Sequence, residues 1–379
     1  MMARRPVRSR FAGRRFAGRR FAVRRFARRW FRRPAAHIAA GLVLAIGVLG
    51  GLAPPVLAHG ANALLPPAPS DFLFDWAFDG LVTIPLLLVG AAYLWAVGRV
   101  DAAHPGNRVP RSRIVAFLAG LAVIEIALQS IIERYDTTLF SVHMVQHILL
   151  TLVAPPLLAL GAPITLALRV ARPEFRRRVA LPILHSRLLR FLTFPVVAWL
   201  LFASVMWGTH FSPIFNESLE QPLVHQLEHL AYLVAGLLFW WPVVGVDPSP
   251  WRIPNPVRAM YLFLQMPQNT FLALAIYSAA APLYPHYAAI RIRWGPDPLM
   301  DQQIAGGLMW IVGDVVFIVA IVLTVVGWMR SEEREALGRE RREDAQIAAI
   351  RAREAALADR LAAERLGEDR AGDERIGGP

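Results

Sequence analysis

The chain carries one apolar stretch after another, each about 20 residues long, and this pattern restricts its fold more than any other feature. A stretch of that length can cross the hydrocarbon core of a bilayer as a helix. Lipid offers no hydrogen-bond partners, so a spanning segment has to pair its backbone groups within itself. With 55% hydrophobic residues, 18% charged residues and a mean hydropathy of +0.41, the chain is too apolar for a soluble domain. The sequence therefore predicts an all-α, polytopic bundle of membrane helices.

Seven spans are expected after the N-terminal region, and the charges of the loops orient them. Arg residues gather in the loops 99–113, 169–190 and 244–258, whereas the loops between these hold few. Because Lys and Arg favour cytoplasmic loops, the seven-span region is expected to begin outside and to end with its C-terminus in the cytoplasm. The predicted spans lie near residues 80–98, 113–131, 140–160, 191–208, 222–243, 257–280 and 302–328.

The N-terminal region is basic and then apolar. Residues 1–33 hold roughly fourteen Arg and no acid, which accounts for the net charge of +13, and residues 11–29 repeat F-A-G-R-R in steps of five. Because this block precedes an apolar run, it is typical of topogenic charge and does not predict nucleic-acid binding. A cut after Ala58 would fit a signal peptide, and an uncleaved first span is the alternative.

Composition divides the chain into four expected parts. The last of them interleaves Arg with Glu and Asp, a pattern whose i,i+4 pairs support a solvated helix. We expect a cytoplasmic helical tail there, with a docking element for a partner as the alternative. The parts are an Arg-rich low-complexity region (1–33), a signal peptide or first span (34–60), the seven-span membrane domain (61–329) and the charged tail (330–379).

Two H-x-x-x-H pairs, His143/His147 and His225/His229, stand at the starts of two predicted spans. Residues four apart share one face of a helix, so each pair can offer two imidazoles to one metal ion. Ionisable groups within a membrane are costly and tend to mark function. The predicted topology brings further polar residues and thioethers to the same outer face, although each alone also fits an interfacial or packing role. These residues are His210, His286, Glu228, Met144, Met206, Asp301, Gln302 and Gln303.

The chain has no cysteine, which excludes disulfides, thiolate metal sites and cysteine nucleophiles. Imidazoles without thiolates suit zinc, copper, iron or nickel, and nearby thioethers favour copper, Cu(I) especially. An H-x-x-E-H order at 225–229 also occurs in some metalloproteases, so hydrolysis is a weaker alternative. The expected metal ligands are His143, His147, His225 and His229, with His210, Met144 or Met206 as auxiliary ligands.

Other polar residues and prolines interrupt the predicted spans. Glu125 and Asp314 lie inside spans, where a charge needs a partner, a proton or water; structural hydrogen bonding and function both fit them. Proline removes a backbone donor and bends a helix, and Gln265–Asn269 places three amides around one such proline, either as packing contacts or as support for a ligand. The prolines are Pro155, Pro156, Pro163 and Pro267.

Several of these motifs together resemble the CtaG-type assembly factors of caa3 cytochrome c oxidase. His143–His147 is followed by I-L-L-T-L-V-A-P-P-L-L-A-L-G-A-P, and the second pair is followed by W-W-P at 240–242. M-P-Q-N-T-F (266–271) and D-Q-Q-I-A-G-G-L-M-W (301–310) fit later segments of the family. The similarity spans about residues 70–328. It implies a multi-spanning, non-enzymatic factor that helps build a haem–copper oxidase by handling copper, with the metal role carried by the four paired histidines.

From the sequence we therefore expect an assembly factor in the bacterial cell membrane that binds copper on its outer side. Its expected partners are cytochrome c oxidase subunits, a copper-donor protein and the lipid membrane, and no nucleic acid is expected. One alternative is a metal-free scaffold for oxidase assembly. A haem or di-iron membrane redox protein is another, although di-iron enzymes with paired His boxes usually also carry adjacent histidines, which this chain lacks.

Overall fold

The structure is a computed structural model that describes residues 66–68, 70–71, 76, 78–290 and 292–376. These residues belong to one unit of the chain, Val56–Pro379. The expectations for the Arg-rich region, the five-residue repeat and the signal peptide or first span fall on residues outside this described part.

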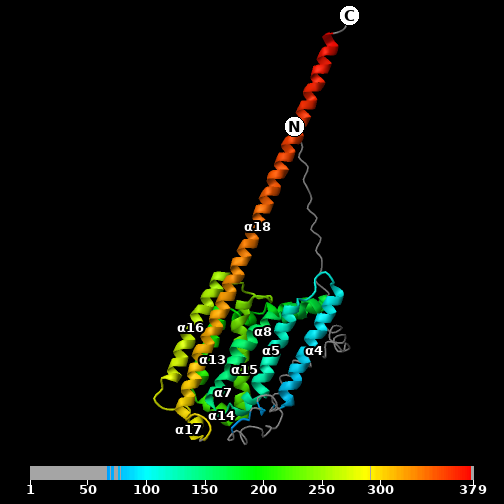
Figure 1. The fold of residues 1–379 in the computed structure, drawn as a ribbon. Helices are drawn as coiled ribbons and strands as arrows, with labels where there is room; N and C mark the ends of the chain where they lie inside the picture. Colours follow the sequence, from blue (N-terminus) through cyan, green and yellow to red (C-terminus); the bar gives the residue numbers. More distant parts are fainter. Residues whose placement is uncertain (1–65, 69, 72–75, 77, 291, 377–379) are drawn as a thin grey trace, which may run out of the picture. The chain divides into compact units, whose positions relative to one another are not determined.

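Long helices packed side by side form the described part of the chain, which contains no strand (Figure 1). Helix α16 packs along α18, α7 packs against α18, α8 lies between α5 and α15, and α13 packs against α15. The helical membrane bundle predicted from the sequence is confirmed. The long elements are α4 (Gly80–Ala103), α5 (Arg111–Gln129), α7 (Phe140–Ile148) continued by the π-helix η1 (Leu149–Val153) and α8 (Ala154–Leu160), α13 (Pro195–His210), α15 (Pro222–Val244), α16 (Asn255–Tyr277) and α18 (Pro298–Ile376).

All seven predicted spans are helical. Five segments are long and apolar enough to cross a membrane, and a sixth is obtained when α13 and α14, which meet at a bend of 69°, are taken as one span. Helix α16 has the length of a span but is not among these, because the amides around Pro267 lower its hydropathy. The number of seven spans therefore stays a prediction. The five segments are Gly80–Ala103, Arg111–Tyr135, Phe140–Val170, Pro222–Val244 and Pro298–Ala358.

The third predicted span is irregular because of its prolines. Pro155 has no N–H to donate to the carbonyl of Thr151, and the helix widens into η1 just before it. The indole N–H of Trp240, from α15, donates to that free carbonyl at 3.1 Å. Gly236 lets α15 approach this closely, since a Cβ there would lie 2.9 Å from the Thr151 oxygen. The Pro-Pro and Trp-Trp-Pro segments thus form one packed joint between two spans.

The same span ends at Ala162, whose left-handed backbone (φ 51°) separates α8 from α9 (Pro163–Val170). The carboxylate of Asp247 accepts the backbone N–H of Thr165 at 2.6 Å and fixes the start of α9. Short helices then carry the Arg-rich loop, and others connect spans elsewhere. They are α6 (Ile131–Tyr135), α10 (Pro173–Phe175), η2 (Arg176–Ala180), α11 (Leu181–Leu184), α12 (Arg187–Leu192), α14 (Pro213–Glu220) and α17 (Pro285–Ala289).

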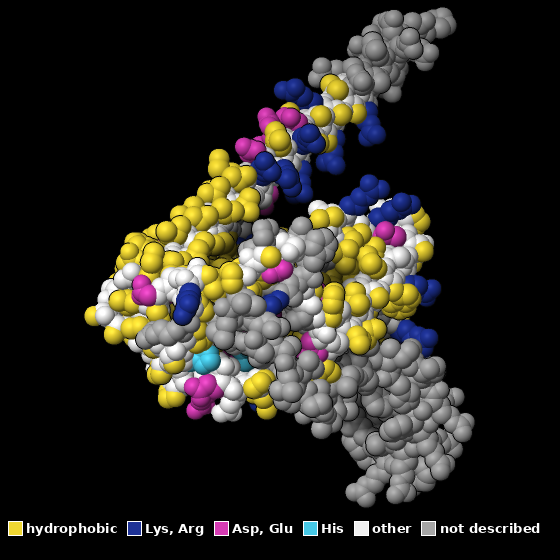
Figure 2. Space-filling view, turned by 60° about the horizontal axis from the view of Figure 1, so that its bottom comes forward, with side chains coloured by type: hydrophobic (Ala, Val, Ile, Leu, Met, Phe, Trp, Pro, Cys, Tyr) yellow, Lys and Arg dark blue, Asp and Glu magenta, His cyan; other side chains and the backbone are white. Residues whose placement is uncertain are grey.

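Helix α18 continues without a break from the bundle into the charged segment. Its exposed residues beyond 330 alternate basic and acidic side chains, whereas hydrophobic side chains cover much of the bundle face seen in Figure 2. The expected helix in the tail is therefore present up to Ile376. Its cytoplasmic location stays a prediction.

Buried hydrogen bonds join the start of α7 to the start of α18, the start of α18 to the end of α16, and the segment before α17 to the end of α13. The carboxylate of Asp301 in α18 accepts the backbone N–H of Phe140 at 2.6 Å and the hydroxyl of Ser141 at 2.5 Å. Gln302 accepts from the Leu283 N–H and donates to the Ile276 carbonyl, and the Tyr284 hydroxyl donates to the His210 carbonyl at 3.2 Å. These bonds hold the start of α7, which carries His143 and His147, and the end of α13, which carries His210.

Candidate metal centre

The two H-x-x-x-H pairs meet in the interior of the bundle. The rings of His143 and His147 on α7 lie 4.2 Å apart, those of His225 and His229 on α15 lie 4.1 Å apart, and His143 stacks on His225 at 5.3 Å. His210, the last residue of α13, lies 5.8 Å from the His147 ring. All five are buried. The structure thus brings together every histidine that the sequence proposed as a ligand.

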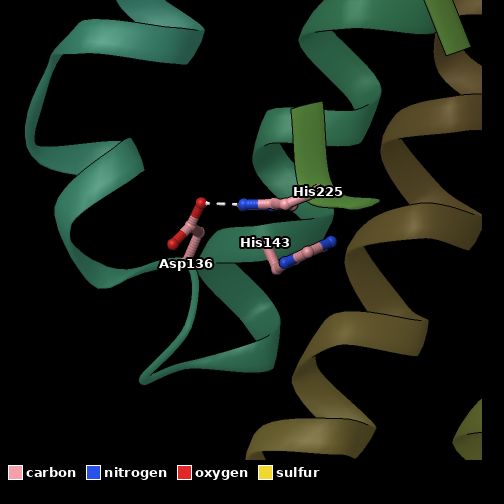
Figure 3. A group of neighbouring side chains, drawn as sticks. All are labelled: Asp136, His143 and His225. Atoms are coloured by element: carbon pink, nitrogen blue, oxygen red, sulfur yellow. Dashed lines mark ion pairs between the residues drawn. The ribbon is translucent and has the colours of Figure 1, made fainter. Parts of the chain in front are cut away.

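Three carboxylates, those of Asp136, Glu228 and Glu133, are grouped with these histidines, and together with the five histidines we call them the histidine–carboxylate cluster. Figure 3 shows Asp136, from the loop before α7, facing His225, with Oδ2 3.5 Å from Nε2. Glu228 on α15 places Oε2 4.0 Å from the Nε2 of His143. Both acids are buried. Because isolated charges are strongly disfavoured in such surroundings, these acids need cationic or hydrogen-bonding partners to be ionised.

Within this cluster, three sets of side chains have ligand atoms that lie within 4.8 Å of one another and have the geometry to hold a metal ion. Neighbouring sets share a residue, so the cluster offers overlapping positions for an ion and no single closed cage. The sets are Asp136, His143 and His225; His143, His147 and Glu228; and Glu133, Asp136 and His229.

Several cluster side chains are held by neighbouring polar groups. Gln146 donates to Glu133 at 2.6 Å and to the Ala127 carbonyl at 2.9 Å, while its own oxygen lies 3.0 Å from the Nε2 of His229. The hydroxyl of Tyr232 donates to Glu228 at 3.3 Å. Outer hydrogen bonds of this kind orient ligands and make metal sites tighter.

The ring nitrogens of His143 and His147 are different, because neither ring has a hydrogen-bond partner on Nδ1 or Nε2. Both side chains are essentially buried, at 0% and 2% exposure. Buried polar atoms without partners are rare and call for an explanation such as a bound ion or water. This is the observation in the cluster that points most directly to a ligand.

Asp136 lies between two membrane spans. Burial, and after it the nearby charge of Glu133, raises the pKa of the Asp136 carboxyl well above its usual range. A cation bound beside the carboxylate would counteract both effects, because an opposite charge favours the ionised form.

Other residues proposed from the sequence have structural partners. Asp301 and Gln302 join helix ends as described, and Gln303 is half-buried on α18. His286 lies outside the cluster sets, with Nε2 2.9 Å from the Thr137 carbonyl. Glu125 accepts from Thr83 at 2.7 Å. Asp314 accepts from Asn269 at 3.2 Å and from Thr270 at 2.9 Å, so for Glu125 and Asp314 the structure shows hydrogen bonding within the bundle.

The two methionines that the sequence proposed as auxiliary ligands, Met144 and Met206, are buried and line one cavity with His147.

Sequence reasoning missed Asp136, Glu133 and Gln146 as members of the cluster. A signal was available, since two acids stand in a short segment between strongly apolar stretches, where an unpartnered charge is costly. Gln146 lies between the two histidines of the first motif, but helical periodicity does not predict its contacts with Glu133 and His229 on other elements.

With this geometry established, comparison with known proteins identifies the family. The family model for the cytochrome c oxidase caa3 assembly factor (Caa3_CtaG) matches residues 91–331, which include every histidine and acid of the cluster. The chain belongs to this family. The resemblance expected from the sequence motifs is thereby confirmed.

This Caa3_CtaG family chain also has relatives in mycobacteria. Uncharacterized proteins of Mycobacterium bovis and Mycobacterium tuberculosis are each 32% identical to it over 290 residues, and one of Mycobacterium leprae is 30% identical. The matches cover 75% of this chain but only 44% of each relative, so the chain spans less than half the length of these proteins. No solved structure matches it.

Proposed function

We propose that this Caa3_CtaG family chain handles copper for a haem–copper cytochrome c oxidase and binds the ion in the histidine–carboxylate cluster. The observation that carries the proposal is the pair of buried imidazoles, His143 and His147, whose ring nitrogens have no hydrogen-bond partner although carboxylates and further imidazoles surround them. Neutral imidazole is a good ligand for copper, and the family's role in oxidase assembly supplies a use for it.

The charge of the cluster supports a metal cation over a neutral ligand. Each of the three ligand sets contains at least one carboxylate, from Asp136, Glu133 or Glu228, and Asp136 and Glu228 are buried. A cation would compensate these acids in a way that imidazoles alone do not. Overlapping ligand sets also leave an ion exchangeable, as delivery to another protein requires.

The arrangement favours a carrier over a hydrolase. In an H-x-x-E-H metalloprotease both histidines of the motif bind one zinc ion. Here His225 belongs to a set with Asp136 and His143, whereas His229 belongs to another with Glu133 and Asp136. Glu228 accepts a hydrogen bond from Tyr232, and its other oxygen faces His143. We therefore propose a non-catalytic role.

We further propose that the cluster lies on the extracytoplasmic side of the bacterial cell membrane, with the C-terminus of the chain in the cytoplasm. The Arg-rich elements α9 to α12 follow the far end of the third span from His143, and cytoplasmic loops carry such charge. Oxidase subunits would receive the copper, and a separate donor protein would supply it.

The direct test is elemental analysis of detergent-purified, full-length protein, comparing the wild type with the double variant His143→Ala/His225→Ala. After loading with copper(II), we expect about one copper per chain in the wild type, and loss of it in the variant. The double variant His104→Ala/His185→Ala is the matched control, because both of those histidines are exposed outside the cluster. Iron in the wild type would instead indicate haem or di-iron chemistry, and no metal after copper loading would indicate a scaffold.

The role in oxidase assembly needs a second test in cells. The same cluster variant should lower cytochrome c oxidase activity while the amount of the variant protein in the membrane stays normal. Normal oxidase activity in cells that contain only the variant would contradict the copper-handling proposal.

A further inference from the structure

A small cavity lies beside the cluster, deeper along α7. It is a cavity of about 20 Å³ between α7, α13, α16 and α18. This is enough space for a single water-sized occupant. His147 and three methionines, Met144, Met206 and Met309, are among the residues that line it, and we call it the thioether cavity.

The three methionines come from three different helices, α7, α13 and α18, and all three are buried at 8% exposure or less. Methionine is common as filler in cores, but three methionines and a histidine around one cavity can supply thioether and imidazole donors together. Thioether and imidazole donors together favour copper, and thioethers favour its monovalent state.

The cavity also has unpartnered polar atoms in its wall. Both ring nitrogens of His147 lack a hydrogen-bond partner, as do Oε1 of Gln265 and Nε2 of Gln268. The two glutamines bond each other through their remaining amide atoms, so these free atoms are not satisfied within the pair. His147 and Gln265 are 2% and 1% exposed. Polar atoms this deeply buried require a ligand or a water molecule.

The charge of the cavity distinguishes it from the cluster. All the described side chains that line it are uncharged, whereas the cluster holds three carboxylates. Burying a cation without a counter-charge becomes more costly as its charge rises, so a neutral cavity favours a monovalent ion over a divalent one.

We propose that the thioether cavity is a binding site for monovalent copper, with Met144, Met206 and Met309 as sulfur ligands and His147 as the ligand it shares with the cluster. The inference rests on the proposed copper function for the identity of the cargo. It goes further by assigning a separate site, a soft-metal preference and a ligand, Met309, that the histidine motifs do not indicate.

The test uses detergent-purified, full-length protein and silver(I), a monovalent soft ion that does not change oxidation state. The variant Met144→Leu/Met206→Leu/Met309→Leu keeps side-chain volume nearly constant. We expect it to bind silver(I) at least about tenfold more weakly than the wild type in competition with a chelator. The control variant Met260→Leu/Met300→Leu/Met329→Leu changes methionines that are 53–58% exposed, and it should bind like the wild type.

X-ray absorption on the Cu(I)-loaded protein provides the second readout. The wild type should show sulfur ligands, and the single variant Met309→Leu, the mildest change, should show fewer. Unchanged silver(I) affinity in the triple variant, or a wild-type spectrum with nitrogen and oxygen ligands only, would overturn the proposal and leave the cavity to water.

The two proposals fail separately. If His143→Ala/His225→Ala binds copper(II) normally while the methionine variant loses silver(I), the cluster proposal is contradicted and the cavity proposal is supported. If the cluster variant loses copper(II) and the methionine variant binds silver(I) normally, only the cavity proposal is contradicted.

Discussion

The histidine–carboxylate cluster and the thioether cavity share His147 but differ in charge and in the softness of their donors. The cluster combines imidazoles with Asp136, Glu133 and Glu228, and the cavity combines three thioethers with uncharged amides. By donor type, the first set would favour divalent ions and the second monovalent copper. The difference teaches that one helix, carrying Met144 next to the two histidines of its motif, contributes residues to two sets of donors that differ in charge and softness.

The largest effect is expected from Asp301→Ala, which removes the carboxylate that holds the start of α7 and thereby supports both compartments. Buried donors on Phe140 and Ser141 would lose their acceptor. This change should lower the free energy of unfolding by ~3 kcal/mol, which a lower thermal unfolding midpoint in detergent would show. Copper binding to both the cluster and the thioether cavity should also weaken. Glu220→Ala removes an exposed carboxylate that accepts from Asn216, and it should change the midpoint little. Equal midpoints for the two variants would contradict this role of Asp301.

His147→Ala removes the residue that the histidine–carboxylate cluster and the thioether cavity share. We expect copper(II) and silver(I) affinities both to fall by about 100-fold, because each compartment loses a ligand. Chelator competition measures both affinities, and His185→Ala, an exposed histidine, serves as the control. A variant that loses affinity for one ion only would show that His147 belongs to a single compartment.

Gly236→Ala tests the joint between α15 and η1 that sets the spacing of the two histidine pairs. The new Cβ would lie 2.8 Å from Pro155 and 2.9 Å from the Thr151 oxygen. A destabilisation of about 2 kcal/mol is expected from this overpacking, measured as a lower unfolding midpoint. The matched change Gly208→Ala, where a Cβ meets nothing within 4 Å, should be neutral or slightly stabilising. Identical midpoints would mean that the joint yields without cost.

Glu228→Gln should have the smallest effect, and it tests whether the cluster and the thioether cavity differ in charge. The change keeps shape but removes one negative charge near His143. Copper(II) affinity should fall by about tenfold, while silver(I) affinity should be unchanged because Glu228 does not line the thioether cavity. If both affinities fell equally, the two compartments would not be electrostatically distinct.

Much of this architecture follows from the sequence for simple physical reasons. The apolar stretches of membrane length are helices in the structure. The two H-x-x-x-H pairs lie together because each pair lies on one helix face near the same end of the bundle. The family resemblance rested on the same motifs, and the family model confirms it.

Other features depend on tertiary contacts that periodicity does not encode. Asp136 joins His225 across 89 residues, and Met309 comes from a helix that starts more than 150 residues after Met144. The prolines predict a bend but not the π-helix before Pro155, where Trp240 from another span donates to the Thr151 carbonyl. The burial of His143 and His147 was likewise not predictable from residues placed at span ends.

The position of His147 has a consequence for how many ions the chain can hold. A neutral imidazole has a single acceptor nitrogen and carries its proton on the other. His147 can therefore ligate an ion on the cluster side or one on the cavity side, and serving both would require an imidazolate. If both proposals hold, metal binding to the cluster and to the thioether cavity would be anticooperative, since whichever fills second lacks one ligand. At low copper concentration the chain would carry one ion, bound either in the cluster or in the thioether cavity. A metal titration would then show the second binding step at a higher metal concentration.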